Sequence, residues 1–160
     1  LEEDLDGTAR PLDGDWDSSA VGEMGCLEYN PETADSNGDG IPDWWYVGYG
    51  LDPCLEDTAL GNPDADPFNN EGEYAADTNP TNPASYFCIL AISNRPPVEV
   101  FFQSSSNRVY SLRGCAGLCP QEWSGIPGAT NRPGNGSAMA LEDPDASATS
   151  RFYRIEVKMP

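Results

Sequence analysis

The sequence contains no histidine, a single lysine and no long apolar run. Without histidine it lacks the commonest general base, the Ser-His and Cys-His pairs of nucleophilic catalysis, and the commonest zinc and haem ligand. One lysine leaves little scope for Schiff-base chemistry, and a helix that spans a bilayer needs about 18 consecutive apolar residues. We therefore expect a protein that is not an enzyme and does not insert into a membrane.

Positive charge is also scarce, but only in one half of the chain. The net charge is −19; residues 1–80 carry 21 acids and one base, whereas residues 81–160 carry 6 acids and 7 bases. Nucleic-acid binding needs a basic footprint, which neither half offers. Crowded carboxylates repel one another unless divalent cations neutralise them. The charge distribution predicts a metal-stabilised first half followed by an electrically neutral module.

The sequence has no initiator methionine and no signal peptide, which leads us to expect a processed product. Five cysteines without a CxxC pair favour an oxidising, extracellular or cell-surface setting. A bond between Cys115 and Cys119 would close a small loop. A disulfide bond between Cys26 and Cys54 would cross-link the acidic half. Cys88 would then be left as a strand thiol or as a link to another chain. The alternative is five buried free thiols.

Oxygen-bearing side chains at alternate positions mark a candidate calcium loop. Calcium takes six to eight oxygen ligands, which a loop can supply from positions 1, 3, 5, 7, 9 and 12. Positions 1 to 9 fall on Asp35, Asn37, Asp39, the Ile41 carbonyl and Asp43. Gly40 suits the sharp turn at position 6. Position 12 is Tyr46, so the last ligand would come from Asp52, Asp77 or water; the alternative is a solvated turn.

A second copy follows after one loop and one helix. Its positions 1, 3, 5, 7, 9 and 12 fall on Asn62, Asp64, Asp66, the Phe68 carbonyl, Asn70 and Glu73. Glu73 is placed to bind a calcium ion through both oxygens. Pro67 replaces the glycine of position 6, so this loop must turn differently.

A third candidate site lies in the acidic segment 1–29. Its alternating acids are Asp13, Asp15 and Asp17, with Glu23 or Glu28 able to complete the set. The alternative, which the spacing does not exclude, is a simply solvated acidic turn.

The apolar pattern predicts a mainly β fold with two short helices. The expected helices are Pro42–Leu51 and Asn70–Thr78. The expected strands are Tyr86–Ser93, Val98–Gln103, Arg108–Arg113, Ser137–Leu141 and Arg151–Val157. We expect an acidic segment 1–29, a calcium-binding region 30–84 and a small antiparallel β-sandwich or open barrel over 85–160. The free edges of such a sheet can be extended by a strand of another chain.

Two stretches, residues 35–45 and 62–83, resemble the thrombospondin type 3-like, EF-hand-like calcium repeats of secreted bacterial proteins. The shared marks are Pro-Asp-Trp-Trp after the first loop, a Leu-Asp-Pro turn, and Asn-Pro-Thr-Asn-Pro at the exit. Residues 3–29 look like the final coil of secreted right-handed β-helix proteins, and residues 85–160 are similar to a small C-terminal β module of surface proteins. The resemblance implies bound Ca²⁺ and a place outside the cell.

These observations lead us to expect a secreted, calcium-binding structural protein that assembles with its own copies, as an oligomer or polymer, at the cell surface or in a filament. One alternative is a calcium-stiffened polysaccharide-binding module, in which Trp123, Tyr110 or Tyr153 stacks on sugar rings. The other is the non-catalytic tail of a larger secreted β-helix enzyme.

Overall fold

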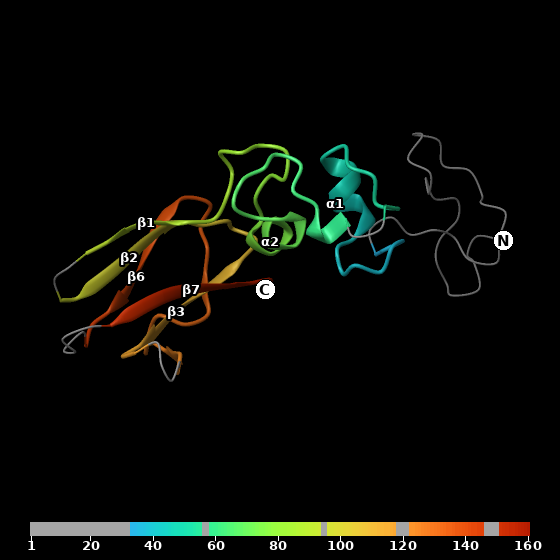
Figure 1. Cartoon of the computed structure of the whole chain (residues 1–160). Helices are drawn as coiled ribbons and strands as arrows, with labels where there is room; N and C mark the ends of the chain where they lie inside the picture. Colours follow the sequence, from blue (N-terminus) through green and yellow to red (C-terminus); the bar gives the residue numbers. More distant parts are fainter. Residues whose placement is uncertain (1–32, 56–57, 94–95, 118–121, 146–150) are drawn as a thin grey trace, which may run out of the picture. The chain divides into compact units, whose positions relative to one another are not determined.

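A computed structural model describes residues 33–55, 58–93, 96–117, 122–145 and 151–160 (Figure 1). Its described part holds two short α-helices and seven strands in two sheets, so the expected mainly β fold is confirmed. No described helix is long and apolar enough to cross a membrane. The third candidate site, with Asp13, Asp15 and Asp17, lies outside the described residues.

The chain groups into two compact units, Leu1–Asn62 and Pro63–Pro160. The second loop from Pro63 onward groups with its helix and the β-strands, and the first loop belongs to the other unit. The calcium-binding region 30–84 stays a prediction.

The described part of the first unit is built around helix α1 (Asp43–Gly48), with a short 3-10 helix η1 (Thr58–Leu60) after it. Ile41, Trp45 and Tyr46 are buried, and the Trp45 and Tyr46 rings meet edge to face with centroids 5.3 Å apart. The chain leaves the helix through Gly50, whose φ of 71° favours a residue without Cβ. The helix is therefore shorter than predicted at both ends.

In the second unit, helix α2 (Asn70–Ala76) begins where the sequence predicts. The Asn69 side chain caps it by accepting a hydrogen bond from the Gly72 N–H (3.0 Å). The helix ends at Asp77, which adopts the left-handed conformation with φ 62°. Asparagine and aspartate tolerate that conformation better than other non-glycine residues, so α2 stops before Thr78.

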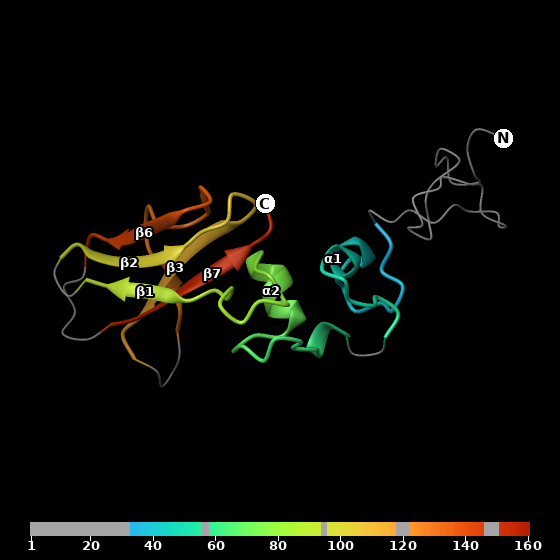
Figure 2. The same cartoon turned by 90° about the horizontal axis from the view of Figure 1, so that it is seen from above.

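Two antiparallel sheets form the rest of the second unit (Figures 1 and 2). The first has the order β1-β2-β6, with bounds β1 Ile89–Ile92, β2 Val98–Gln103 and β6 Ala138–Asp143. The second is centred on β3 (Val109–Cys115), which pairs with β7 (Phe152–Lys158) over its whole length. Two short strands, β4 (Ser124–Gly125) and β5 (Arg132–Pro133), pair with the two ends of β3.

The hydrophobic core lies between these sheets. Its buried members are Val100, Phe102, Tyr110, Leu112, Ile126, Ala129 and Leu141. Val100 and Phe102 share one face of β2 because alternate residues of a strand point the same way. The Phe102 ring meets the Tyr110 ring of β3 with centroids 4.9 Å apart, so aromatic contact joins the two sheets. Each fully buried large side chain contributes about 1.5–3 kcal/mol.

Candidate metal centre

The loop that leads into α2 holds two aspartates in a fixed relation. The Asp66 N–H donates to Asp64 Oδ1 (3.2 Å), and the Phe68 N–H donates to Asp66 Oδ1 (2.7 Å). Ala65, between the aspartates, has a positive φ of 60°. Each backbone bond occupies one carboxylate oxygen, so the second oxygen of each aspartate can turn toward the inside of the loop.

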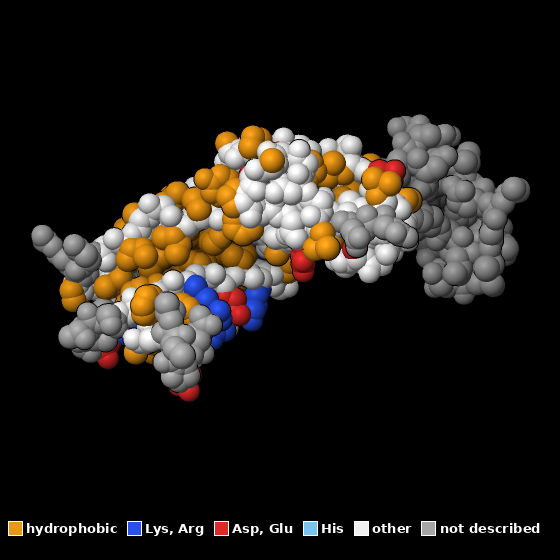
Figure 3. Space-filling model, viewed as in Figure 1, with side chains coloured by type: hydrophobic (Ala, Val, Ile, Leu, Met, Phe, Trp, Pro, Cys, Tyr) orange, Lys and Arg blue, Asp and Glu red, His pale blue; other side chains and the backbone are white. Residues whose placement is uncertain are grey.

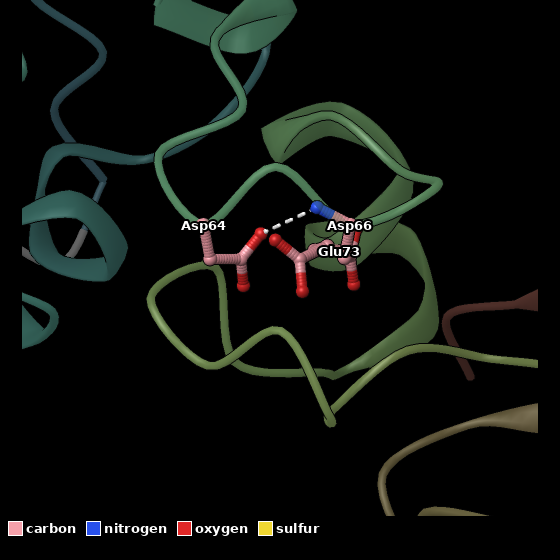
Figure 4. Close-up of side chains that lie close together, drawn as sticks. All are labelled: Asp64, Asp66 and Glu73. Carbon is pink, nitrogen blue, oxygen red and sulfur yellow. Dashed lines mark hydrogen bonds between the residues drawn. The ribbon is translucent and has the colours of Figure 1, made fainter.

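Glu73 completes the cluster from the first turns of α2. Asp64, Asp66 and Glu73 each offer a carboxylate oxygen, and these atoms lie within 4.8 Å of one another (Figure 4). Calcium–oxygen distances of 2.3–2.6 Å place ligands on opposite sides of an ion about 4.6–5.2 Å apart. The spacing of the three oxygens therefore suits a calcium ion.

The cluster is short of hydrogen-bond donors. Glu73 has no exposed surface, and neither of its carboxylate oxygens has a hydrogen-bond partner. Asp64 Oδ2 is likewise buried without one. A buried, unpaired carboxylate costs several kcal/mol, on the order of 3–5, unless a cation or a proton compensates it. The residues present therefore fit a divalent cation.

The electrostatics of Glu73 lead to the same conclusion. Burial, and then the charges of Asp64 and Asp66, raise the pKa of Glu73 from 4.5 to about 7. The Thr78 hydroxyl lowers this pKa, although it makes no hydrogen bond of normal geometry. In the absence of a cation a proton is the alternative compensating charge, so cation and proton compete for this site.

The other predicted ligands of this loop are Asn62, Phe68 and Asn70. Asn70 is buried as the first residue of α2, and Phe68 precedes the helix as a half-buried residue. Asn62 belongs to the first compact unit, whereas the cluster belongs to the second. The structure thus brings together Asp64, Asp66 and Glu73, with Asn70 at the start of the same helix.

The loop that leads into α1 repeats the local pattern. The Asp39 N–H donates to Asn37 Oδ1 (3.1 Å), and the Ile41 N–H donates to Asp39 Oδ1 (2.9 Å). Gly38, the counterpart of Ala65, has a φ of 71°. Asp43 and Asn70, at position 9, are the first residues of their helices. The two loops are therefore copies of one loop–helix unit.

In this first loop, however, the carboxylate oxygens of Asp35 and Asp43 accept hydrogen bonds. Asp35 accepts from the N–H groups of Asp39 (3.1 Å) and Gly40 (2.9 Å). Both oxygens of Asp43 accept from Ser36, one from its N–H (2.9 Å) and one from its hydroxyl (2.6 Å). Within the described part of the chain, Asp35, Asp39 and Asp43 do not gather three oxygens as closely as the second loop does.

Tyr46 takes the place of the missing position-12 glutamate. Its buried hydroxyl donates to Asp39 Oδ2 (2.7 Å), which also accepts from Asn37 Nδ2 (2.9 Å). Burial and the negative charge of Asp39 raise the pKa of Tyr46 above its ordinary value, so the hydroxyl stays protonated. A neutral donor therefore stands where the second loop has a carboxylate.

Asp52 and Asp77, the candidate replacements for that ligand, make other contacts. Asp52 accepts a hydrogen bond from the Cys54 N–H (2.9 Å). Asp77 belongs to the second unit, where it accepts from the Ser105 hydroxyl and from Asn107 Nδ2. Asp77 thus connects the end of α2 to the turn between β2 and β3.

Arg108 anchors the same helix end, a role that the sequence reasoning missed. Its guanidinium is almost fully buried and donates to the carbonyls of Tyr74 (2.5 Å) and Ala75 (2.8 Å). It also lies 3.9 Å from Asp77. A cation is favourable at the carbonyl end of a helix. The helix that carries Glu73 is therefore fastened to the sandwich, and no local sequence signal connects residues so far apart along the chain.

The three aromatic residues considered for sugar stacking are buried or already in contact with other side chains. Tyr110 is fully buried in the core. The Tyr153 hydroxyl donates to Asp143 Oδ2 (2.9 Å). Trp123 is half-buried, and the Arg154 guanidinium lies over its ring at 4.7 Å. These contacts give no support to a polysaccharide-binding platform built from the three.

The cysteine pairing stays a prediction. Cys54 is exposed, Cys88 half-buried and Cys115 buried, and these described cysteines are not joined to one another. The partners that we expected for two of them, Cys26 and Cys119, lie outside the described residues.

The metal-site interpretation therefore depends on the chain's own geometry: a repeated loop, a cluster of three acids around the fully buried Glu73, and Glu73 oxygens without donors. Comparisons with protein families, with curated proteins and with solved structures found no match for this chain.

Proposed function

We propose that the chain is a calcium-binding structural module, in which the loop that leads into α2 holds the ion. The observation that carries the proposal is Glu73, whose two buried oxygens have no hydrogen-bond partner and lie beside Asp64 and Asp66. A calcium ion would be held by these three carboxylates, and a ligand from Asn70 would suit the spacing. The ion supplies the positive charge that the cluster lacks.

Calcium bound there would stabilise the second unit as a whole. The loop continues into α2, and α2 is fastened to the sandwich through Arg108. Removing the repulsion within the cluster therefore favours the folded state of the loop, the helix and their contact with the sheets. We propose a structural role on this ground, with the first loop acting as a scaffold held by its own hydrogen bonds.

We also propose that the protein works outside the cell. Extracellular calcium modules bind with dissociation constants of about 10⁻⁴–10⁻³ M, an affinity range open to sites with few protein ligands. The cluster gathers only three carboxylates, and the acid-rich composition of the first half suits an environment in which calcium is always abundant.

The test compares melting temperatures in calcium and in excess chelator for the whole chain, Glu73→Gln and Glu71→Gln. Glu71 is the matched control because it is exposed on the same helix. At a calcium concentration of about 100 times the dissociation constant, binding adds about 2.7 kcal/mol to the free energy of unfolding. We expect this gain in the wild type and in Glu71→Gln, and its loss in Glu73→Gln.

In chelator we expect Glu73→Gln to be at least as stable as the wild type, since an amide removes the repulsion within the cluster. A wild-type protein that gains no stability in calcium would overturn the proposal. If calcium stabilised Glu73→Gln and Glu71→Gln equally, the ion would bind at a site that does not include α2.

A further inference from the structure

Strand β1 is the least protected apolar element of the sandwich. All four of its residues are exposed, with Leu90 at 56% and Ile92 at 50% of their accessible surface. Residues 78–94, which include β1, contain no charged side chain in a chain of net charge −19. Figure 3 shows hydrophobic side chains gathered over this part of the sandwich.

The backbone of β1 is open on one side. The strand lies at the edge of the sheet, with the order β1-β2-β6. The Ser93 N–H donates to the Glu99 carbonyl of the neighbouring strand (2.9 Å), so Ile92, the residue before it, directs its N–H and C=O away from β2. Among the described residues, no strand pairs with that side.

This edge lacks the usual protection against pairing. Natural edge strands carry charges or prolines that discourage another strand from adding to them. The opposite edge strand, β6, ends in Glu142 and Asp143, whereas β1 reads Ile-Leu-Ala-Ile. The contrast within one sheet marks β1 as the edge at which a further strand can add.

The exposed isoleucines extend the core face of the sheet. Ile89 pairs with Phe102 and Ile92 pairs with Val100, so both lie on the face that carries the buried core residues. In a regular strand, residues three apart point to opposite faces. The register irregularity between Ile89 and Ala91 brings Ile89 and Ile92 to the same face. Ile89 is 38% exposed, although its cross-strand partner Phe102 is fully buried. The core face of the sheet therefore extends to β1, where the isoleucine side chains are left partly exposed.

A groove of about 740 Å³ adjoins the start of β1. It is lined by the chain that leads into the strand, by the end of β2 and by the end of α2. Its lining includes Tyr86, Phe87, Cys88, Leu90, Gln103 and Ala76. An extended segment that pairs with β1 would continue into this groove.

We propose that β1 pairs antiparallel with β1 of a second copy, about a two-fold axis, so that two three-stranded sheets become one continuous sheet. A second copy fits because the edge is self-complementary: an uncharged apolar strand meets an identical one. A partner that recognises charged side chains would find none on this strand. The half of the chain that carries β1 is close to neutral, so two copies can approach along it without the repulsion of their acidic halves.

Because the strand is short, the interface is small, and interfaces below about 1,200 Å² are typical of weak complexes. We therefore expect a dimer that forms with increasing protein concentration. The proposal is independent of the metal site, since β1 does not contribute to the acidic cluster.

The test is sedimentation of the whole chain over a wide concentration range, in saturating calcium, for the wild type, Ile92→Lys and Met159→Lys. Met159 is the matched control, because it is 52% exposed in the same unit. We expect the wild type and Met159→Lys to approach twice the chain mass as concentration rises. We expect Ile92→Lys to stay monomeric with an unchanged melting temperature.

Hydrogen exchange of the Leu90 and Ile92 amides provides a second readout. Both should exchange more slowly in concentrated wild-type protein than in dilute protein, with no change along β6. A wild type that stays monomeric, or an Ile92→Lys variant that dimerises like the wild type, would overturn the proposal. A mass that keeps growing beyond the dimer would overturn the closed two-fold pairing.

Discussion

The loop before α1 and the loop before α2 share a backbone conformation but differ in the residue at position 12. In both, the residue at position 4 has positive φ, position 5 is held through the side chain at position 3, and position 9 begins a helix. At position 12 they diverge: Tyr46 donates a hydrogen bond into its loop, and Glu73 adds a negative charge to its own. The spacing of the Asn and Asp side chains therefore sets the loop shape, while one residue on the helix decides whether the loop requires a cation.

The largest effect that separates the loops should appear with pH in the absence of calcium. Because the folded pKa of Glu73 is raised to about 7, its favourable contribution is complete below 4.5 and is lost as pH rises through 7. We expect the free energy of unfolding in chelator to fall on the order of 3 kcal/mol over this window, measured by denaturant titration.

Calcium should reverse that trend, since the ion competes with the proton and binds better at higher pH. Glu73→Gln should remove the pH dependence in chelator across this window. A wild-type profile that stays flat between about pH 5 and 8 would contradict a buried Glu73 carboxylate without donors.

Substitution at position 5 compares the loops directly. We expect Asp66→Asn to weaken calcium binding at least a hundredfold, about 2.7 kcal/mol, because it removes a charged ligand from the cluster. The matched variant Asp39→Asn should leave calcium affinity nearly unchanged. Calorimetric titration measures both, and an equal loss of affinity in the two variants would break the comparison.

The attachment of the second loop to the sandwich predicts a further difference. Arg108→Ala should lower the free energy of unfolding by about 2 kcal/mol, because two carbonyls at the end of α2 lose a charged donor. The loss should appear in calcium and in chelator alike, by thermal melting. A variant as stable as the wild type would mean that α2 is held by other contacts.

The smallest expected effect concerns the first loop. Tyr46→Phe should cost about 1–2 kcal/mol, because Asp39 loses a buried hydroxyl donor while the ring is kept. The cost should be the same with and without calcium in parallel melts. A cost that vanishes in calcium would show that an ion replaces the lost donor, and that the first loop also binds one.

Much of the local structure follows from the sequence. The alternating acids predict both loops, the residue pattern places the start of α2 at Asn70, and the period-two run over 98–103 predicts β2. These features depend on neighbours in the chain, which sequence patterns record directly.

The contacts that distinguish the loops do not follow from it. Whether Tyr46 reaches Asp39, and whether any donor reaches Glu73, is decided by how each helix packs on its loop. The contact of Arg108 with α2, and the exposure of β1, depend on which sheet each segment joins. Such long-range contacts leave no local pattern, so the buried oxygens of Glu73, which favour the second loop, become visible only in the structure.

The most direct test of the account is anomalous diffraction from crystals of the whole chain grown in calcium. It locates bound calcium without reference to stability. We predict the strongest peak between the carboxylates of Asp64, Asp66 and Glu73, with a weaker peak or none in the loop of Asp35 and Asp39. A strong peak in the first loop and none beside Glu73 would contradict the central claim.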